Sequence, residues 1–425
     1  MVGRYRHSLW FRRSVSLYGP AMRVLKWILI AVGILILLPV IGYGALYVTD
    51  PVYFGRYLSS FAIDPVKDVE FYEPLERVPG RPGEPLPRAE PAQRTISEKA
   101  WNKARAYAIE TESVALLVWH KGALQYEYYG PGFDRTSRTD PASMHKSVIA
   151  LVIGAAIEDG TLPSIDEPAS TYLEEWANDG RSKITIRDLL QMASGLYREP
   201  FSLSPLSDTM KMNLGTDVAT LTFAQPARRP PGEEFDYNAY NPQALGILLE
   251  RASGQRYAQV LSEKLWSKLG TNDAFVWLDH EGGLPRTYCC LHATAEDWLR
   301  VGLLHLNNGR INGLQVISED WMAAVTTGSK LQPNYGYQTW LGSPYQALRD
   351  YGPYVATQVR HDEPYVADDV IYFDGAGGQR VYIIPSYDMV IVRTGTGGFD
   401  FSTGAFTWED SSIPNTLMRG VLPDN

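Results

Sequence analysis

Cysteine is nearly absent from this chain: only two occur among 425 residues, and they are adjacent, Cys289 and Cys290. Neighbouring cysteines rarely form a disulfide without backbone strain, so we expect two small buried residues and a fold that does not depend on disulfides. Two adjacent cysteines also exclude a zinc site of the C-x-x-C type. The histidines show no H-E-x-x-H motif, and we therefore expect neither a metal nor a cofactor.

Acidic residues are missing from the first 49 positions. The first 26 residues instead carry six basic side chains: Arg4, Arg6, Arg12, Arg13, Arg23 and Lys26. Removing those six charges from the formal net charge of −9 leaves −15 for residues 27–425. An acidic body argues against a nucleic-acid partner, because the phosphate backbone requires a basic surface.

Charge is absent from Trp27–Val48, a run of 22 mostly apolar residues. As a helix this run spans roughly 30 Å, the thickness of a bilayer hydrocarbon core. It is longer than the apolar region of a usual signal peptide and lacks a clear cleavage site, so we interpret it as a single-pass anchor. The positive-inside rule then places residues 1–26 in the cytoplasm and the catalytic body outside, in the periplasm or extracellular space.

Proline marks the segment that follows, with seven occurrences between positions 65 and 91. This density rules out a continuous helix and favours extended chain. The sequence therefore predicts four parts: a basic terminus at 1–26, a transmembrane anchor at 27–48, a connector at 49–96 and a catalytic domain at 97–425.

Helix and strand patterns define the start of that domain. Ile96–Glu110 is helix-forming, with Ser97 as N-cap. Ser113–His120 and Ala123–Gly130 are β-rich and are joined by Lys-Gly, which predicts a hairpin. A second helix is expected over Ser143–Asp159.

Strand patterns return near the C-terminus, at Asp368–Gly375, Gln379–Pro385 and Asp388–Gly395. Residues 170–330 between the two sets of strands are mostly of helical pattern, and Ile413–Leu422 predicts a closing helix. We therefore expect an α+β fold in which N- and C-terminal segments complete one antiparallel sheet, flanked by helices and carrying a helical insert.

Ser143 and Lys146 form the only Ser-x-x-Lys of the chain, in SMHK. Residues three apart share one helix face, so the hydroxyl and the amine point the same way. The following run, SVIALVIGAAI, is apolar on nearly all sides, as in buried helices. Burial lowers a lysine pKa and frees the amine to act as a base, whereas a simpler interpretation makes Ser143 a helix cap and Lys146 a solvated side chain.

A Ser-His-Asp triad is the competing arrangement, but the chain contains no G-x-S-x-G elbow. His145 lies between Ser143 and Lys146 and would face away from both of them. We expect His145 to pack or to hydrogen bond rather than to take part in the chemistry.

Two later stretches accompany SMHK in order: PGEEFDYNAYNPQALGILLE (Pro231–Glu250) and GAGGQ (Gly375–Gln379). In these three motifs the chain resembles the serine β-lactamase/penicillin-binding protein superfamily, and specifically its class C-like branch. That branch includes D-alanyl-D-alanine peptidases, esterases and 6-aminohexanoate-dimer hydrolases. The resemblance covers Ser113–Gly395 and implies a β-lactamase/DD-peptidase-like α/β fold.

The resemblance also implies roles for residues of the second motif, which is Tyr-x-Asn in the family. Tyr237 would shuttle the proton between nucleophile and leaving group. Ala239 stands where the family has its asparagine, and the neighbouring Asn238 and Asn241 are candidates for the lost substrate contact.

The third motif would form one edge of the site. Gly377 and Gly378 would let substrate approach the backbone, and the N–H groups of Ser143 and Gln379 would form the oxyanion hole. Ala376 occupies the position of the family's basic residue. Its lack of charge disfavours β-lactams and favours a neutral amide or ester.

The sequence thus predicts a membrane-anchored serine hydrolase that cleaves an amide or ester of a small molecule or short peptide through a Ser143 acyl-enzyme. Two alternatives stay open. One is a module that binds penicillin or peptidoglycan without turnover, and the other is a true β-lactamase or D-Ala-D-Ala carboxypeptidase.

Overall fold

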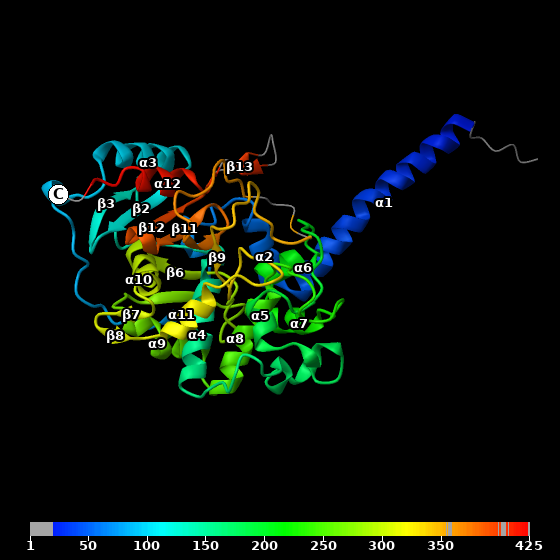
Figure 1. Ribbon diagram of the computed structural model, residues 1–425. Helices are drawn as coiled ribbons and strands as arrows, with labels where there is room; N and C mark the ends of the chain where they lie inside the picture. The colour runs from blue at the N-terminus through cyan, green and yellow to red at the C-terminus, as the bar shows by residue number, and fades with distance from the viewer. Residues whose placement is uncertain are drawn as a thin grey trace, which may run out of the picture. The chain divides into compact units, whose positions relative to one another are not determined.

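The computed structural model describes residues 20–353, 355, 359–397, 399–400, 405–406 and 408–423. It divides the chain into two units, residues 1–55 and 56–425. The first unit contains helix α1 (Pro20–Thr49), in which an 18-residue stretch within Val24–Thr49 has a mean hydropathy of 2.7 and is not buried (Figure 1). This helix is long and apolar enough to cross a membrane, and a signal sequence would meet the same criterion.

A six-stranded antiparallel sheet organises the second unit, in the order β3-β2-β12-β11-β10-β9. The hairpin of β2 (Ser113–His120) and β3 (Ala123–Tyr129) pairs through β2 with β12 (Met389–Gly395). Strands β11 (Gln379–Ile384) and β10 (Ile371–Gly375) continue the sheet. The prediction of one antiparallel sheet built from both ends of the domain is confirmed.

The two faces of this sheet bury alternate residues, as the period of a strand requires. One face packs against α3 (Glu98–Glu110) and α12 (Ser412–Met418). The other face packs against α10 (Ala295–Leu306) and the core around α4 (His145–Glu158). Figure 1 shows α10 and α4 on the opposite side of the strands from α3 and α12. Buried α4 thus carries its first residues to the rim of the sheet.

Local signals account for two helix starts, the first of which the sequence predicts. The Ser97 side chain accepts a hydrogen bond from the Ala100 N–H at the start of α3. The Thr294 side chain and Asp297 form a reciprocal capping box at the start of α10.

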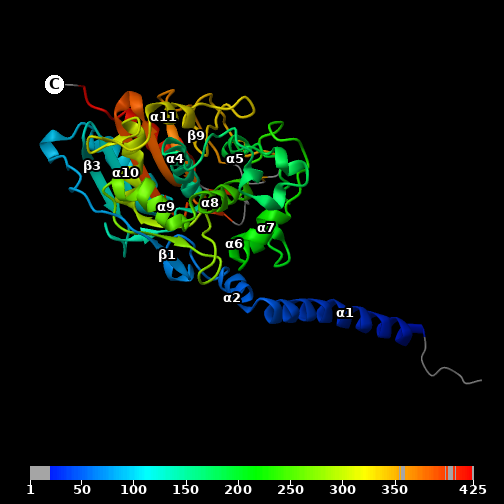
Figure 2. The ribbon, with the colours of Figure 1, turned by 90° about the horizontal axis from the view of Figure 1, so that it is seen from below.

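Helices dominate the middle of the chain and gather beside the sheet (Figure 2). They are α5 (Ile186–Leu190), α6 (Asp208–Leu214), α7 (Val218–Ala224), α8 (Tyr240–Ser253), α9 (Tyr257–Lys264) and α11 (Glu319–Val325). A second, four-stranded sheet, absent from our expectation, lies in the order β1-β5-β6-β4. Its strands are β1 (Leu75–Val78), β5 (Ala274–Trp277), β6 (Leu291–Thr294) and β4 (Arg138–Thr139).

The segment expected as a connector also contains regular structure. It includes α2 (Pro51–Ser59), a 3-10 turn at Val69–Phe71 and strand β1, which pairs with β5. The remaining strands are short. β7 (Arg310–Ile311) pairs with β8 (Leu314–Gln315), and β13 (Phe399–Asp400) pairs with β14 (Ala405–Phe406). β9 (Trp340–Leu341) pairs with β10 at the edge of the six-stranded sheet.

Candidate active site

Ser143 lies in a single 3-10 turn, Ala142–Met144, that leads directly into α4. The turn begins with Ala142 in the left-handed region (φ 48°), and its N–H donates to the Asp140 carboxylate over 3.2 Å. The N-cap of α4 is Met144, and no side chain caps the helix. Ser143 therefore does not cap α4, contrary to the simpler interpretation of its position.

The Lys146 amine is buried beside Ser143, with 4% of the residue exposed. Its Nζ donates to Ser143 Oγ over 2.7 Å and to the Tyr288 carbonyl oxygen over 2.7 Å. Burial lowers the pKa of Lys146 to about 7; the Asp374 carboxylate opposes this shift, and Arg198 adds to it. A substantial fraction of the amine is therefore neutral at pH 7 and able to accept a proton.

Tyr237 completes the group from the segment just before α8. The Lys146 Nζ lies 4.9 Å from the centre of its ring. Burial raises the pKa of Tyr237, the Asp374 charge adds to this, and a hydrogen bond with Ser143 opposes it. The ring contacts three aromatic neighbours, edge-on with Tyr335 and Tyr351 and tilted with Trp340. The structure thus brings Ser143, Lys146 and Tyr237 together, with Tyr237 as a neutral phenol.

A cavity of about 210 Å³ opens onto this group. Its lining comprises Ser143, Arg198, Tyr237, Tyr351, Val355, Val359, Asp374, Gly375, Ala376, Gly377, Gly378, Arg380 and Trp408. The loop between β10 and β11 supplies one wall, and the segment before α6 supplies Arg198. The cavity therefore offers a bounded space for a small substrate next to the serine hydroxyl.

Gly377 and Gly378 line the cavity with left-handed backbones (φ 77° and 75°). A Cβ at Gly378 would lie 2.7 Å from Trp408 and 3.0 Å from Arg393 Nη1. Buried Arg393 also donates to the Gly377 carbonyl oxygen over 2.6 Å. Packing and conformation both require glycine here, and they keep the loop backbone close to the cavity.

Gln379 follows this loop as the first residue of β11 and is fully buried. Its side chain exchanges hydrogen bonds with Gly395 of β12, donating to the Gly395 carbonyl oxygen and accepting from its N–H. The side chain therefore fixes the strand, and only the backbone N–H is left for the predicted oxyanion role.

Asn238 and Asn241 are buried and do not line the cavity. Asn238 Oδ1 accepts from the Asn241 N–H over 3.0 Å, and its amide donates to the Asp236 carbonyl oxygen over 2.9 Å. Asn241 Oδ1 accepts from the Ser194 hydroxyl over 2.5 Å. Both side chains organise the first turn of α8 instead of pointing at the cavity.

His145 is buried on the far side of the turn, as expected. Its Nδ1 is 2.7 Å from the Cys289 carbonyl oxygen and its Nε2 is 2.8 Å from the Tyr257 hydroxyl. Burial lowers the pKa of His145 to about 4, so the ring is neutral at pH 7. Both ring nitrogens are engaged in hydrogen bonds within the core, which leaves His145 outside the chemistry.

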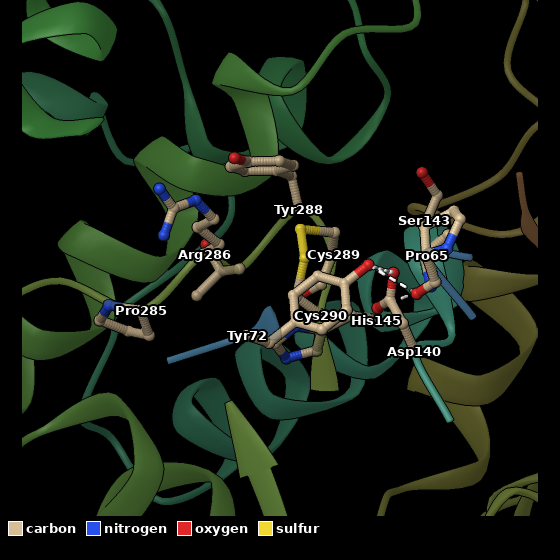
Figure 3. Close-up of a disulfide and its surroundings, with 12 residues drawn as sticks. Pro65, Tyr72, Asp140, Ser143, His145, Pro285, Arg286, Tyr288, Cys289 and Cys290 are labelled. Atoms are coloured by element: carbon tan, nitrogen blue, oxygen red, sulfur yellow. Dashed lines mark hydrogen bonds between the residues drawn. A yellow bond between two sulfur atoms is a disulfide. The ribbon is translucent and has the colours of Figure 1, made fainter. Parts of the chain in front are cut away.

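Cys289 and Cys290 form a disulfide (Figure 3), so our expectation of two free thiols was wrong. Cys290 has a left-handed backbone (φ 67°), which accommodates the adjacent pairing. The carbonyls of Tyr288 and Cys289 hold Lys146 and His145 respectively. The disulfide is therefore next to the backbone that positions the proposed base.

A buried charge cluster that sequence reasoning missed lies behind the cavity. Asp374 pairs with Arg349 over 2.9 Å and with Arg380, and it accepts from the Tyr351 hydroxyl over 2.6 Å. Asp410 pairs with the same two arginines. The sequence separations, from 6 to 61 residues, give no local signal for such a cluster. Asp374 and Arg380 on the cavity wall are therefore already neutralised.

The fold and this site define a class of protein. The family model described as Beta-lactamase matches residues 102–404, so the chain belongs to that family and to the serine β-lactamase/penicillin-binding protein superfamily. Of the described residues, no group of three or more His, Cys, Asp or Glu is arranged to hold a metal ion.

Two named proteins are similar to this chain in sequence. The 6-aminohexanoate-dimer hydrolase of Paenarthrobacter ureafaciens is 29% identical over 301 residues, which are 64% of this chain and 76% of that protein. The protein flp of Staphylococcus aureus (strain MW2) is 27% identical over 136 residues, 31% of this chain and 26% of flp.

Solved structures show the same fold. A putative 6-aminohexanoate-dimer hydrolase from Bacillus anthracis aligns with a TM-score of 0.63 and 21% identity, covering 84% of this chain and 90% of that one. A putative beta-lactamase from Bacteroides dorei aligns with a TM-score of 0.61 and 20% identity, covering 77% and 99%. The family match and the 6-aminohexanoate-dimer hydrolase relative, together with this fold, make the chain a hydrolase of the β-lactamase-related type.

Proposed function

We propose that this hydrolase cleaves an amide or ester bond through an acyl-enzyme formed on Ser143. The observation that carries the proposal is the 2.7 Å contact between the Lys146 amine and the Ser143 hydroxyl. The lowered pKa of Lys146 makes that amine a base near neutral pH. A nucleophile, a base within hydrogen-bond reach and an adjacent phenol are the parts that acyl transfer requires.

The reaction proceeds in two halves. Ser143 Oγ bonds to the substrate carbonyl carbon while its proton passes to neutral Lys146. Collapse of the tetrahedral intermediate breaks the bond to the amine or alcohol, which takes a proton relayed through Tyr237. Water then adds to the ester, its proton passes to the Tyr237/Lys146 pair, and the acid is released as the serine regains its proton.

The backbone N–H groups of Ser143 and Gln379 are proposed to hold the oxyanion. The close approach of the two elements supports this: a Cβ at Gly375, the partner of Gln379 in the β10-β11 pair, would lie 2.2 Å from the Pro141 carbonyl oxygen. Each such donor is typically worth about 3 kcal/mol of transition-state stabilisation.

The substrate is an amide or ester of a small molecule or short peptide, held in the cavity of about 210 Å³. Two of the similar proteins are named 6-aminohexanoate-dimer hydrolase, which makes that dimer one member of the substrate panel. The panel adds p-nitrophenyl esters, nitrocefin, a D-Ala-D-Ala peptide and short amides.

The deciding comparison is Ser143→Ala against Ser147→Ala on this panel. Ser147 lies four residues further along, inside buried α4, and its hydroxyl donates to the Gln338 carbonyl oxygen over 2.8 Å, away from the cavity. We expect Ser143→Ala to lose turnover of every substrate and Ser147→Ala to keep it. Near-wild-type turnover by Ser143→Ala overturns the proposal. Absence of both turnover and fluorophosphonate labelling in the wild type identifies a module that only binds.

We also propose that α1 anchors the chain in a membrane, with the N-terminus cytoplasmic and the catalytic unit outside. The unburied apolar helix and the basic residues that precede it in the sequence support this topology. The full chain should resist carbonate extraction, and external protease should digest its catalytic unit in intact spheroplasts. A mature N-terminus beyond residue 49 would instead identify a cleaved signal.

A further inference from the structure

Arg198 is the feature of the cavity that the proposed chemistry does not use. It lines the wall of the cavity together with Ser143 and Tyr237, and its side chain is half-buried. One hydrogen bond is assigned to its guanidinium, from Nη1 to the Tyr237 carbonyl oxygen over 2.9 Å. A guanidinium carries five N–H donors, so most of its donors are left for a ligand.

No carboxylate in the described part of the chain lies within 4 Å of Arg198, in contrast to the other cation on the wall. Arg380 is fully buried and is paired with both Asp374 and Asp410. Arg198 feels the more distant charge of Asp236, but the buried Asp236 Oδ1 has no hydrogen-bond partner among the described residues. Burial raises the pKa of Asp236 to about 6, so this carboxylate is mostly ionised at pH 7. It lies beyond ion-pair distance of Arg198, however, and leaves the N–H donors of the guanidinium available to a ligand.

Holding a half-buried arginine at a cavity wall without an ion-pair partner costs free energy unless an anion pairs with it. Its planar fork matches a carboxylate with two parallel hydrogen bonds. Ala376, on the opposite loop, contributes no charge to the cavity. The positive charge of the site is therefore on the Tyr237 side and not on the loop between β10 and β11.

We propose that Arg198 binds a carboxylate in the leaving-group half of the substrate, so that the enzyme acts on amides or esters whose amine or alcohol part is anionic. This inference rests on the proposed function, because Tyr237, whose carbonyl Arg198 contacts, is the residue assigned to protonate the leaving group. It replaces the expectation of a neutral substrate that followed from Ala376 alone.

Two chromogenic esters test the inference on the full chain: 3-carboxy-4-nitrophenyl acetate and its 3-carbamoyl-4-nitrophenyl counterpart. They share the acyl group and differ in carboxylate against neutral carboxamide on the leaving group. We expect the wild type to prefer the carboxylate ester in kcat/KM by roughly 10- to 100-fold, the range of a charge-assisted contact. The difference should appear mainly in KM.

Variants separate recognition from folding. Arg198→Gln should lose the preference while keeping kcat/KM for the carboxamide ester, and Arg198→Lys should keep part of it. Arg310→Gln, at an exposed position of β7 outside the cavity, is the control and should retain the full preference. A variant that fails to fold loses both esters and its fluorophosphonate labelling, and Arg198→Met then takes its place.

The outcomes distinguish the two proposals. Turnover of both esters at equal rates by the wild type, or a carboxylate preference that survives in Arg198→Gln, overturns the role of Arg198 and leaves the serine chemistry intact. Absence of turnover and of fluorophosphonate labelling in the wild type overturns the proposed function itself.

Discussion

The Lys146 amine, buried in the first turn of α4, donates over 2.7 Å to the hydroxyl of Ser143 in the 3-10 turn that precedes this helix. This relationship combines a nucleophile with a base whose charge is disfavoured by burial. The Tyr288 carbonyl oxygen holds the same amine from the opposite side. These two hydrogen bonds fix the direction of the amine, while burial lowers its pKa.

The pH dependence of acylation follows from Lys146. Burial lowers its pKa to about 7, and only the neutral amine accepts the serine proton. The kcat/KM for an ester without ionisable groups should therefore rise as pH increases through about 7 and then level off. Measurement between pH 5 and 9 checks this, and a flat profile across that range would contradict the assignment of Lys146 as base.

Removing the amine should cost activity but not stability. Lys146→Met keeps a similar volume while deleting a buried ionisable group, so we expect activity to fall by roughly 10²- to 10⁴-fold and thermal stability to stay equal or rise. Ester hydrolysis and calorimetry measure the two quantities. An active Lys146→Met variant, or one that loses activity only because it unfolds, would contradict the role of Lys146 as the base.

Tyr237→Phe separates the proton relay from ring packing. The phenyl ring keeps the contacts to Trp340 and Tyr351, so we expect the fold to survive and kcat to fall by roughly 10²-fold or more. Tyr335→Phe is the matched control, because its buried hydroxyl has no hydrogen-bond partner among the described residues. Equal activity in the two variants would argue against the relay.

Asp374, on the cavity wall, raises the pKa of the proposed base Lys146. Its negative charge favours the protonated form of Lys146, so Asp374→Asn should lower the pKa of Lys146 and move the acidic limb of kcat/KM to lower pH. The same change leaves Arg349 and Arg380 short of a partner and should destabilise the fold by roughly 3–5 kcal/mol. Asp166→Asn, at an exposed surface ion pair, is the control and should change neither the pH profile of kcat/KM nor the stability. An acidic limb of kcat/KM that stays in place in Asp374→Asn would contradict the coupling between Asp374 and Lys146.

The disulfide next to Tyr288 should affect catalysis through the backbone. Reduction frees residues 289 and 290 and loosens the carbonyl that holds Lys146, so we expect kcat/KM to fall by about tenfold, a cost typical of small misplacements. Intact-mass measurement follows the gain of two hydrogen atoms. Reductant should not affect Cys289→Ser/Cys290→Ser, and an equal response of wild type and double variant would contradict the link.

Local patterns predicted much of this fold. The hairpin of β2 and β3, the three C-terminal strands and the cap at Ser97 each rest on alternation or capping within a few residues. The sheet β1-β5-β6-β4 was missed because its strands have two to four residues. Such short strands show no measurable period, and their pairing depends on residues far away in the sequence.

The residues of the site likewise fall into those that the sequence predicted and those that it did not. Spacing alone put Ser143 and Lys146 on one helix face, and the family resemblance supplied Tyr237. Neither route indicates Arg198, because a solvated arginine and a cavity arginine look alike in sequence. The disulfide was missed since the left-handed backbone of Cys290 that permits it is a property of the fold.

The most direct test of the account is the chemical state of Ser143 during turnover. The wild type is mixed with a slowly hydrolysed p-nitrophenyl ester, quenched in acid, digested and analysed by mass spectrometry. We predict an acyl group on the peptide that contains Ser143, formed at the rate of the p-nitrophenol burst and absent from Ser143→Ala. Steady turnover with Ser143 unmodified, or with the acyl group on another residue, would contradict the acyl-enzyme.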